Sequence, residues 1–400
     1  MSRAEEIGAG VGAKDPAQDI PWGALAILFT AHFVVDGTVN FIAPLLPLIR
    51  EQFQVSLSTG GLLLTFVSMS AALSQPVTAI LVDRWPGLPW LAFGMVGSAL
   101  FITSIGWAPN FTVLTVMVAI GGSMVGLCHP DMASRAGALS EHRKGLVVSV
   151  FIAGGRVGHG LGPVIAIGIV SLGGMKWLWS FTLVAIAMAL AVKYGLPKPQ
   201  SPPASGENKA SIWDFVTALR QAGTPLLLLS GVTICRAVVN INFISLIPSL
   251  YAEHGMSIWS GGAASAIMLT SGALGVLAGG ALGDRFGKKE LIVGGIGLGA
   301  LCVCAFLIAP PEWGFVLLAF LGVATYLPMG VTMAFAQQLM PHNRGLASSI
   351  TLGLSWFIAS LSVYPMSVLG EWFGLANAFW ALPGFFVAAC AFACFLPKVR

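Results

Sequence analysis

Long apolar stretches alternate with short polar breaks along the whole chain, and this alternation is the strongest pattern in the sequence. Each stretch is about long enough to cross a hydrocarbon core of roughly 30 Å as a helix that rises 1.5 Å per residue. Dividing the chain at its charges, prolines and polar turns therefore predicts twelve membrane-spanning helices. Their approximate ranges are 22–49, 58–82, 88–107, 110–130, 146–172, 177–196, 224–251, 258–283, 290–309, 313–339, 346–370 and 374–396.

Composition agrees with a protein embedded in a lipid bilayer and excludes several other classes. Hydrophobic residues make up 56% of the chain and charged residues only 9%, which excludes an ordinary soluble domain. The 49 glycines suit closely packed helices and argue against a barrel. Basic residues are scattered singly despite a net charge of +4, so we expect no nucleic-acid binding. The six cysteines match no ligand spacing, and we expect neither a metal nor a cofactor.

Lysine and arginine placement predicts the orientation of these helices. The tail 1–21 lacks the basic start and short apolar core of a secretory signal. Loop cations gather on the side of this tail, and only Arg50 and Lys176 fall on the other side. The positive-inside rule then places both termini in the cytoplasm, in the cell's inner (plasma) membrane. A stretch rich in proline, serine and glycine, 197–223, is expected to be a cytoplasmic linker between the six-helix bundles 22–196 and 224–400.

The two predicted bundles are copies at an offset near 200 residues. Parallel six-helix repeats related by an axis along the membrane normal are a transporter architecture, with substrate sites at the midplane between the halves. The matching positions are Asn40 with Asn240, Val55-Ser56 with Met256-Ser257, Asp83-Arg84 with Asp284-Arg285, His142 with His342, and Gly145 with Gly345.

One loop resembles the signature of the major facilitator superfamily. It reads Gly280-Ala-Leu-Gly-Asp284-Arg285-Phe-Gly287-Lys288-Lys289, and Ala79-Ile-Leu-Val-Asp83-Arg84-Trp-Pro-Gly87 is a weaker copy in the first half. With the twelve helices and the central linker, the resemblance covers the whole chain. It implies an all-α membrane protein built from two pseudo-symmetric six-helix bundles.

A narrower resemblance points to the fosmidomycin resistance family of bacterial drug exporters. It is carried by the stretch from His32 to Asn40, by Cys128-His129-Pro130-Asp131 through Arg135, and by Phe151-Ile-Ala-Gly154-Gly155-Arg156-Val-Gly158. The stretch Gly158-His-Gly-Leu-Gly162-Pro163-Val-Ile-Ala166 is similar to the antiporter motif of superfamily exporters, with Ala166 in place of the usual glycine. This resemblance favours export over import.

Few ionisable residues lie inside the predicted spans, and such residues are functional by default. We expect Asp36, with His32 or His159, to bind a coupling proton, while Arg156 and Arg236 attract an anionic group on the substrate. Asp36 and Arg236 are equivalent under the repeat, so the two halves are expected to offer opposite charges to one central cavity. Protonation of Asp36 is expected to loosen its hold on Arg156 or Arg236 and so release a cation for substrate. The alternative is a permanent structural pair between Asp36 and an arginine, and His159 is equally explained by a hydrogen bond to a neighbouring helix.

Other polar and aromatic residues are expected to complete the substrate cavity. Trp356 aligns with Arg156 by the repeat, which would place a flat apolar surface opposite a cation, although a lipid-facing position explains Trp356 equally well. The remaining members of the predicted substrate site are Asn40, Asn240, Tyr326, Gln337 and Tyr364.

Glycine ridges and loop charges predict how the two halves move. Glycines at 154, 158 and 162 form one ridge and those at 275, 279 and 283 another; we expect them to face each other across the halves, or alternatively to pack only within one half. Carboxylates at the cytoplasmic ends of helices two and eight are expected to cap helices of the opposite half. The predicted conformational gate is Asp83, Arg84, Asp284, Arg285, Gly158, Gly162 and Pro163.

Taken together, these patterns predict a proton-coupled secondary transporter, not an enzyme, which exports a small organic anion or an amphipathic drug as a monomer. The alternatives are an uptake transporter for an organic anion, a passive channel, and a membrane-embedded metal enzyme that uses His129, Asp131 and His159. We place His129 and Asp131 at the cytoplasmic end of helix four, where Asp131 and Arg135 are expected to form a local pair.

Overall fold

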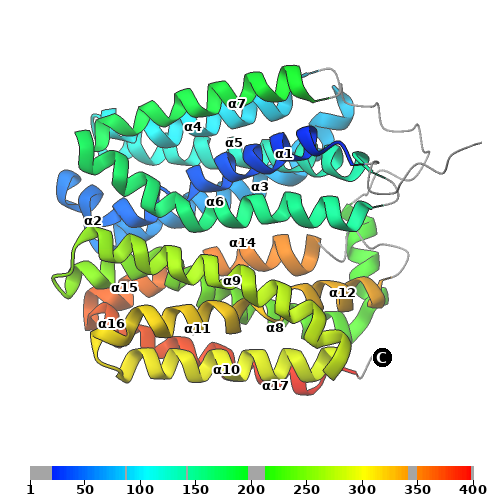
Figure 1. Ribbon diagram of the computed structural model, residues 1–400. Helices are drawn as coiled ribbons and strands as arrows, with labels where there is room; N and C mark the ends of the chain where they lie inside the picture. The colour runs from blue at the N-terminus through cyan, green and yellow to red at the C-terminus, as the bar shows by residue number, and fades with distance from the viewer. Residues whose placement is uncertain (1–19, 86–87, 141–142, 197–211, 341–348, 398–400) are drawn as a thin grey trace, which may run out of the picture.

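The computed structural model describes residues 20–85, 88–140, 143–196, 212–340 and 349–397, which form two helical bundles lying side by side (Figure 1). The helices of the first bundle are α1 (Trp22–Val39), α2 (Ile42–Phe53), α3 (Leu57–Arg84), α4 (Trp90–Thr103), α5 (Phe111–Ala138), α6 (Lys144–Gly173) and α7 (Phe181–Gly195). Those of the second are α8 (Ile212–Glu253), α9 (Ile258–Phe286), α10 (Lys288–Ile308), α11 (Gly314–Tyr326), α12 (Met329–Leu339), α14 (Ser355–Ser360), α15 (Val363–Phe373), α16 (Leu375–Ala378) and α17 (Leu382–Cys394).

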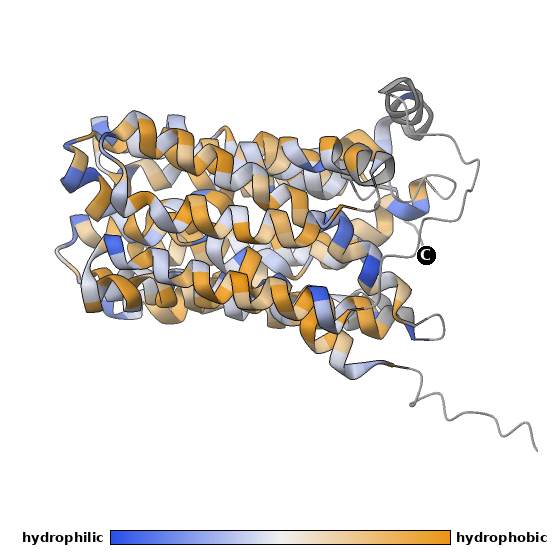
Figure 2. Cartoon of the chain, turned by 90° about the horizontal axis from the view of Figure 1, so that it is seen from above, coloured by the Kyte–Doolittle hydropathy of each residue, from blue (hydrophilic) through white to orange (hydrophobic). Residues whose placement is uncertain are grey.

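Eleven of the twelve predicted spans are found, in the described residues, as helices long and apolar enough to cross a membrane. Hydrophobic residues run along the length of the bundles, and hydrophilic residues concentrate at the two ends (Figure 2). The remaining segment, 346–370, is divided: its described part is a π-helical turn, Ser349–Leu354, followed by α14 and α15. The all-α membrane fold is confirmed.

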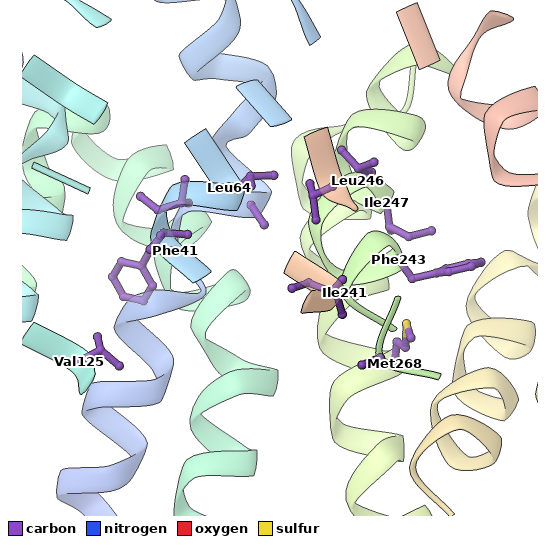
Figure 3. Packing of buried hydrophobic residues seen from close by; sticks show 14 of the residues in the cluster. Phe41, Leu64, Val125, Ile241, Phe243, Leu246, Ile247 and Met268 are labelled. Atoms are coloured by element: carbon purple, nitrogen blue, oxygen red, sulfur yellow. The ribbon is translucent and has the colours of Figure 1, made fainter. Parts of the chain in front are cut away.

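The repeat is visible in how equivalent helices begin and pack. Ser56 accepts a hydrogen bond from the backbone N–H of Thr59 at 3.2 Å and caps α3, and Ser257 caps α9 through Ser260 at the same distance. Each half also buries its own hydrophobic side chains, with Phe41 and Leu64 in the first and Phe243 and Leu246 in the second (Figure 3). The same local signals therefore build both halves.

The linker predicted at 197–223 lies partly outside the described residues, which resume at Ile212. From there the chain is helical, and the backbone breaks at Gly223, whose φ is 57°. A positive φ of this kind favours glycine, so the break falls where the second bundle was predicted to start. The domain boundaries themselves stay a prediction.

The two bundles meet mainly through three helix pairs, α6 with α9, α3 with α15, and α2 with α8. Close approaches occur between Gly61 and Ser367 and between Ile167 and Gly262. These contacts lie toward the end of the protein opposite the start of α1 and the end of α17 (Figure 1). We call that end, where α2 ends and α3 begins, the distal end; it is the end at which the bundles are closed together.

The glycine ridges do not face each other across the two halves, so this prediction is wrong and its alternative is correct. The ridge of α6 packs against α1 of its own bundle, and the ridge of α9 packs against α11 and α12. Glycine lets two backbones approach because it has no Cβ, and here that approach joins helices within one half. The facing pairs are Gly154 with Phe29, Gly158 with Phe33, Gly162 with Gly37, Gly275 with Val323, Gly279 with Leu327 and Gly283 with Val331.

Candidate functional site

A buried carboxylate with three histidines forms the polar centre of the first bundle. Asp36 Oδ2 lies 3.2 Å from His32 Nε2 and 3.0 Å from His159 Nδ1, and Oδ1 lies 3.0 Å from His129 Nε2. The side chains of Asp36 and His32 are 8% and 9% exposed, whereas those of His129 and His159 are each 27% exposed. We call these four residues the Asp36 cluster. Because its outer histidines, His129 and His159, are partly exposed, the cluster is not sealed inside the bundle.

Three helices bring the cluster together. His32 and Asp36 share one face of α1 because they are four residues apart. His159 comes from α6, where Gly155 leaves room for the carboxylate: a Cβ built at Gly155 would lie 2.5 Å from Asp36 Oδ2. The third helix is α5, which continues through Pro130 to Ala138 and so carries His129 inside the bundle.

The position of His129 corrects the prediction that it lies at a helix end. The proline was interpreted as a helix terminator, yet α5 continues past it, so His129 faces the bundle interior instead of a loop. Asp131 does not join the cluster. Its Oδ1 accepts a hydrogen bond from Arg135 Nε at 2.8 Å, which confirms the predicted local pair.

The hydrogen bonds of the cluster require a proton beyond those of neutral histidines. Nδ1 of His32 lies 2.9 Å from the carbonyl oxygen of Phe151, and Nδ1 of His129 lies 2.9 Å from that of Val125. A carbonyl only accepts, so each Nδ1 carries a hydrogen. In a neutral ring Nε2 then carries a lone pair and no hydrogen, and both Nε2 atoms face oxygens of Asp36. Each contact therefore needs one further proton, on Asp36 or on the histidine, to become a hydrogen bond.

The same residues have the donor types of a metal site. The ligand atoms of His32, Asp36 and His129 lie within 4.8 Å of one another. The separations of 3.0–3.2 Å to the carboxylate are also ordinary hydrogen-bond lengths, so protons in the two contacts satisfy the geometry without an ion.

Neither arginine of the membrane interior pairs with Asp36, so the predicted Asp36–arginine contact is wrong. Arg236 of α8 is 1% exposed, and its Nη1 donates to the carbonyl oxygen of Thr325 at 3.4 Å. Arg156 of α6 reaches the other bundle, where its Nη2 lies 3.3 Å from Met329 Sδ. The repeat places equivalent residues at equivalent positions in two different halves, and this equivalence does not bring them into contact.

The other predicted substrate residues divide into those near the arginines and those elsewhere. Tyr326 donates its hydroxyl hydrogen to Asn240 Oδ1 at 3.1 Å, and the guanidinium carbon of Arg156 lies 5.2 Å from the centre of the Tyr326 ring. Tyr326 thus takes the position opposite the cation that was predicted for Trp356.

The remaining predicted substrate residues lie apart from this group. Asn40 donates to the backbone carbonyl of Asp36 at 3.0 Å, and Trp356 is half-buried against the hydrophobic core. Gln337 is half-buried on α12, and Tyr364 is 42% exposed on α15. Among the described residues, no hydrogen bond or ring contact joins any of these four to Arg236.

A family model described as the Major Facilitator Superfamily matches residues 28–363 and 229–400. The chain belongs to the major facilitator superfamily. It is a transporter of small molecules and not an enzyme. As a superfamily member it also resembles the fosmidomycin resistance protein of Escherichia coli, with 24% identity over 384 residues, covering 93% of this chain and 92% of that protein.

Other comparisons agree with this assignment. The MFS-type transporter YfnC of Bacillus subtilis is 26% identical over 359 residues, covering 88% of this chain and 87% of that protein. The multidrug resistance protein MdtG of Salmonella typhimurium is 23% identical over 336 residues, covering 80% of each. A bacterial homologue of the human lysosomal transporter Spinster, solved inward-facing and unoccupied, has the same fold: the TM-score is 0.76 at 16% identity, covering 93% of this chain and 96% of that one.

A hydrogen bond joins the two bundles at the distal end. The backbone N–H of Ser58 donates to Oε1 of Glu371 at 3.0 Å, so a carboxylate of the second bundle caps the start of α3 in the first. Desolvation acts in the opposite direction, but hydrogen bonds from Ser56, Ser58 and Leu57 lower the pKa of Glu371. A hollow of about 580 Å³ at this end, lined by Arg50 and Glu253, is remote from the Asp36 cluster.

The predicted gate residues are only partly described. The side chains of Asp83, Arg84 and Asp284 lie outside the described part, so their capping role stays a prediction. Arg285 lies with its guanidinium carbon 5.3 Å from the ring centre of Phe286 on the same helix. Of the motif residues on α6, Pro163 lies near α9, with its carbonyl oxygen 3.7 Å from where a Cβ on Gly262 would be, while Gly158 and Gly162 face α1.

Proposed function

We propose that this transporter exchanges a small organic anion or an amphipathic drug for protons by alternating access, and that the Asp36 cluster carries the coupling proton. The observation that carries the proposal is the pair of contacts in which Nε2 of His32 and Nε2 of His129 face the oxygens of one carboxylate. Each contact becomes favourable when it gains a proton and unfavourable when that proton leaves. Proton occupancy therefore changes the packing of three helices.

The closed distal end supports an inward-facing state. Gly61 and Ser367 pack together there, while the outer histidines of the Asp36 cluster stay partly exposed. We place the distal end outside the cell, both termini in the cytoplasm and the monomeric protein in the inner membrane, since loop cations gather on the side of the termini. Names of the relatives, which include fosmidomycin and multidrug resistance proteins, favour export.

The proposed cycle uses two separate sites. Arg156 and Arg236 hold the substrate, and the Asp36 cluster holds the proton, so protonation of Asp36 does not have to release an arginine. A ligand shifts a conformational equilibrium only when it binds one state more tightly than the other. The cluster meets this condition because its contacts depend on the positions of α1, α5 and α6.

Proteoliposomes loaded with a pH-sensitive dye test this function. Fosmidomycin and benzoate serve as probes, and we expect their movement to drive proton movement in the opposite direction. Asp36→Asn should abolish the coupling, whereas Asp131→Asn, which makes the same change at a buried carboxylate outside the cluster, should retain it. Concentrative, proton-linked transport by Asp36→Asn, or substrate movement by the wild type without protons, would refute the assignment.

A further inference from the structure

The second bundle contains buried donors that lack acceptors. Arg236 Nε and Asn240 Nδ2 are buried and have no hydrogen-bond partner, although the two residues are 1% and 0% exposed. The remaining contact of the guanidinium, to Thr325 O at 3.4 Å, is long for a hydrogen bond. A buried cation or amide without partners is costly, so this arrangement calls for a ligand that supplies acceptors.

We infer that Arg236, Asn240 and Arg156 form a binding site for an oxyanion, a carboxylate, phosphate or phosphonate group, so that the transported solute is an anion. The inference rests on the proposed function and decides between the two solute classes named there. Arg236 and Asn240 lie one turn apart on α8, and both contact the end of α11, through Thr325 and Tyr326. The two residues with unpartnered donors therefore both lie beside that helix end.

Arg156 adds a second cation from the other bundle. Its guanidinium lies over the same Tyr326 ring, and its Nη2 contacts the sulfur of Met329, which is a weak acceptor. An oxyanion would replace that contact with a stronger, charge-assisted hydrogen bond. Donors from both halves then converge on one ligand, which is the arrangement that alternating access requires at the midplane.

Neither arginine of this site pairs with a carboxylate. Among the described residues, the ion pairs of Asp36 involve histidines and that of Asp131 involves Arg135, so no carboxylate neutralises Arg236 or Arg156. A cationic solute would meet two guanidinium groups that have no carboxylate partner. An anion has the opposite charge and brings the missing acceptors.

Thermal unfolding of the purified protein tests the site with three probes: methylphosphonate, benzoate and the tetraphenylphosphonium cation. We expect both anions to raise the unfolding temperature and the cation to leave it unchanged. Arg236→Gln and Arg156→Gln should each raise the half-saturating concentration of the anions about tenfold or more, because each removes charged hydrogen bonds. Lys176→Gln is the matched control, since that cation lies over Trp107, away from the site.

Folding of the variants is checked in the same measurement. Without ligand, Arg236→Gln should unfold no lower than the wild type because it removes an unpaired buried charge. Anion shifts that survive both arginine substitutions, a shift caused by the cation instead, or no anion shift in the wild type would each overturn the inference. Asp36→Asn should still bind the anions while losing proton coupling, so failure of the anion site and failure of the proton site give different results.

Discussion

Two adjacent glycines at the distal end differ in what they contact: one faces the other bundle, and its neighbour faces its own bundle. Gly61 of α3 faces Ser367 of α15 in the other bundle, and a Cβ added there would lie 2.6 Å from Ser367 Cβ. Gly60 faces its own bundle, where the nearest atom is the terminal Cδ1 of Leu46 at 2.8 Å. Gly61→Ala should therefore push the two bundles apart at the distal end, and Gly60→Ala should not.

The size of the effect follows from packing. Adding a methyl group to a close-packed contact costs about 1–3 kcal/mol when the neighbours cannot move. At Gly61 that cost falls only on the state with a closed distal end, because the opposite state separates α3 from α15. The population ratio should then shift about 5- to 150-fold toward the open distal end. At Gly60 the leucine terminus can rotate, so a smaller and state-independent cost is expected.

Spin labels at exposed positions on the two bundles, Glu51→Cys and Trp372→Cys, measure this shift once the six native cysteines are replaced by serine. Gly61→Ala should increase the long-distance population between the labels. Adding Ser367→Gly to Gly61→Ala should restore the closed population, because it removes the opposing side chain. Equal distance distributions for Gly61→Ala and Gly60→Ala would refute the reasoning.

Three further predictions concern other contacts. Gly158→Ala should lower the free energy of unfolding by about 1–3 kcal/mol without changing the label distances, since Gly158 packs on Phe33 within one bundle; a calorimetric midpoint measures it. The pKa of Glu371 is lowered in the closed state. Its contact with Ser58 therefore stabilises that state at pH values above the ordinary glutamate pKa near 4.3, and this stabilisation is lost as the pH falls through the lowered pKa. The closed population should fall upon such acidification in the wild type but not in Glu371→Gln. His129→Phe should abolish proton coupling in the dye assay; full coupling would remove His129 from the proton site.

The fold was predictable because its signals are local and repeated. Length and apolarity located the spans, and capping serines such as Ser56 and Ser257 recur at nearly the same offset in both halves. Glycine spacing showed that α6 has a smooth face but did not show which helix covers it. Phe29, Phe33 and Gly37 on α1 have the same four-residue spacing as the ridge, and matching the two patterns would have identified the partner.

The site was predictable only in part, since contacts between helices depend on how they are rotated. Asp36, His32 and His159 were selected because each is ionisable within an apolar stretch. His129 was assigned to a helix end because a proline follows it, and only the continuation of α5 shows that it reaches Asp36. A histidine beside a proline near the edge of a predicted span is thus compatible both with a helix end and with the interior of the bundle.

Helix α6 offers a physical route between proton and solute, and from this we infer that the two need not touch. Its backbone carbonyl at Phe151 holds His32, its side chain His159 contacts the carboxylate of the Asp36 cluster, and Arg156, one turn away, reaches Met329 in the other bundle. The helix packs on α1 within its own half and on α9 across the halves. A shift of α6 on protonation would then move Arg156 relative to Arg236 and change the proposed anion site. Coupling by the displacement of one helix would let a carboxylate surrounded by histidines act on arginines that it does not contact.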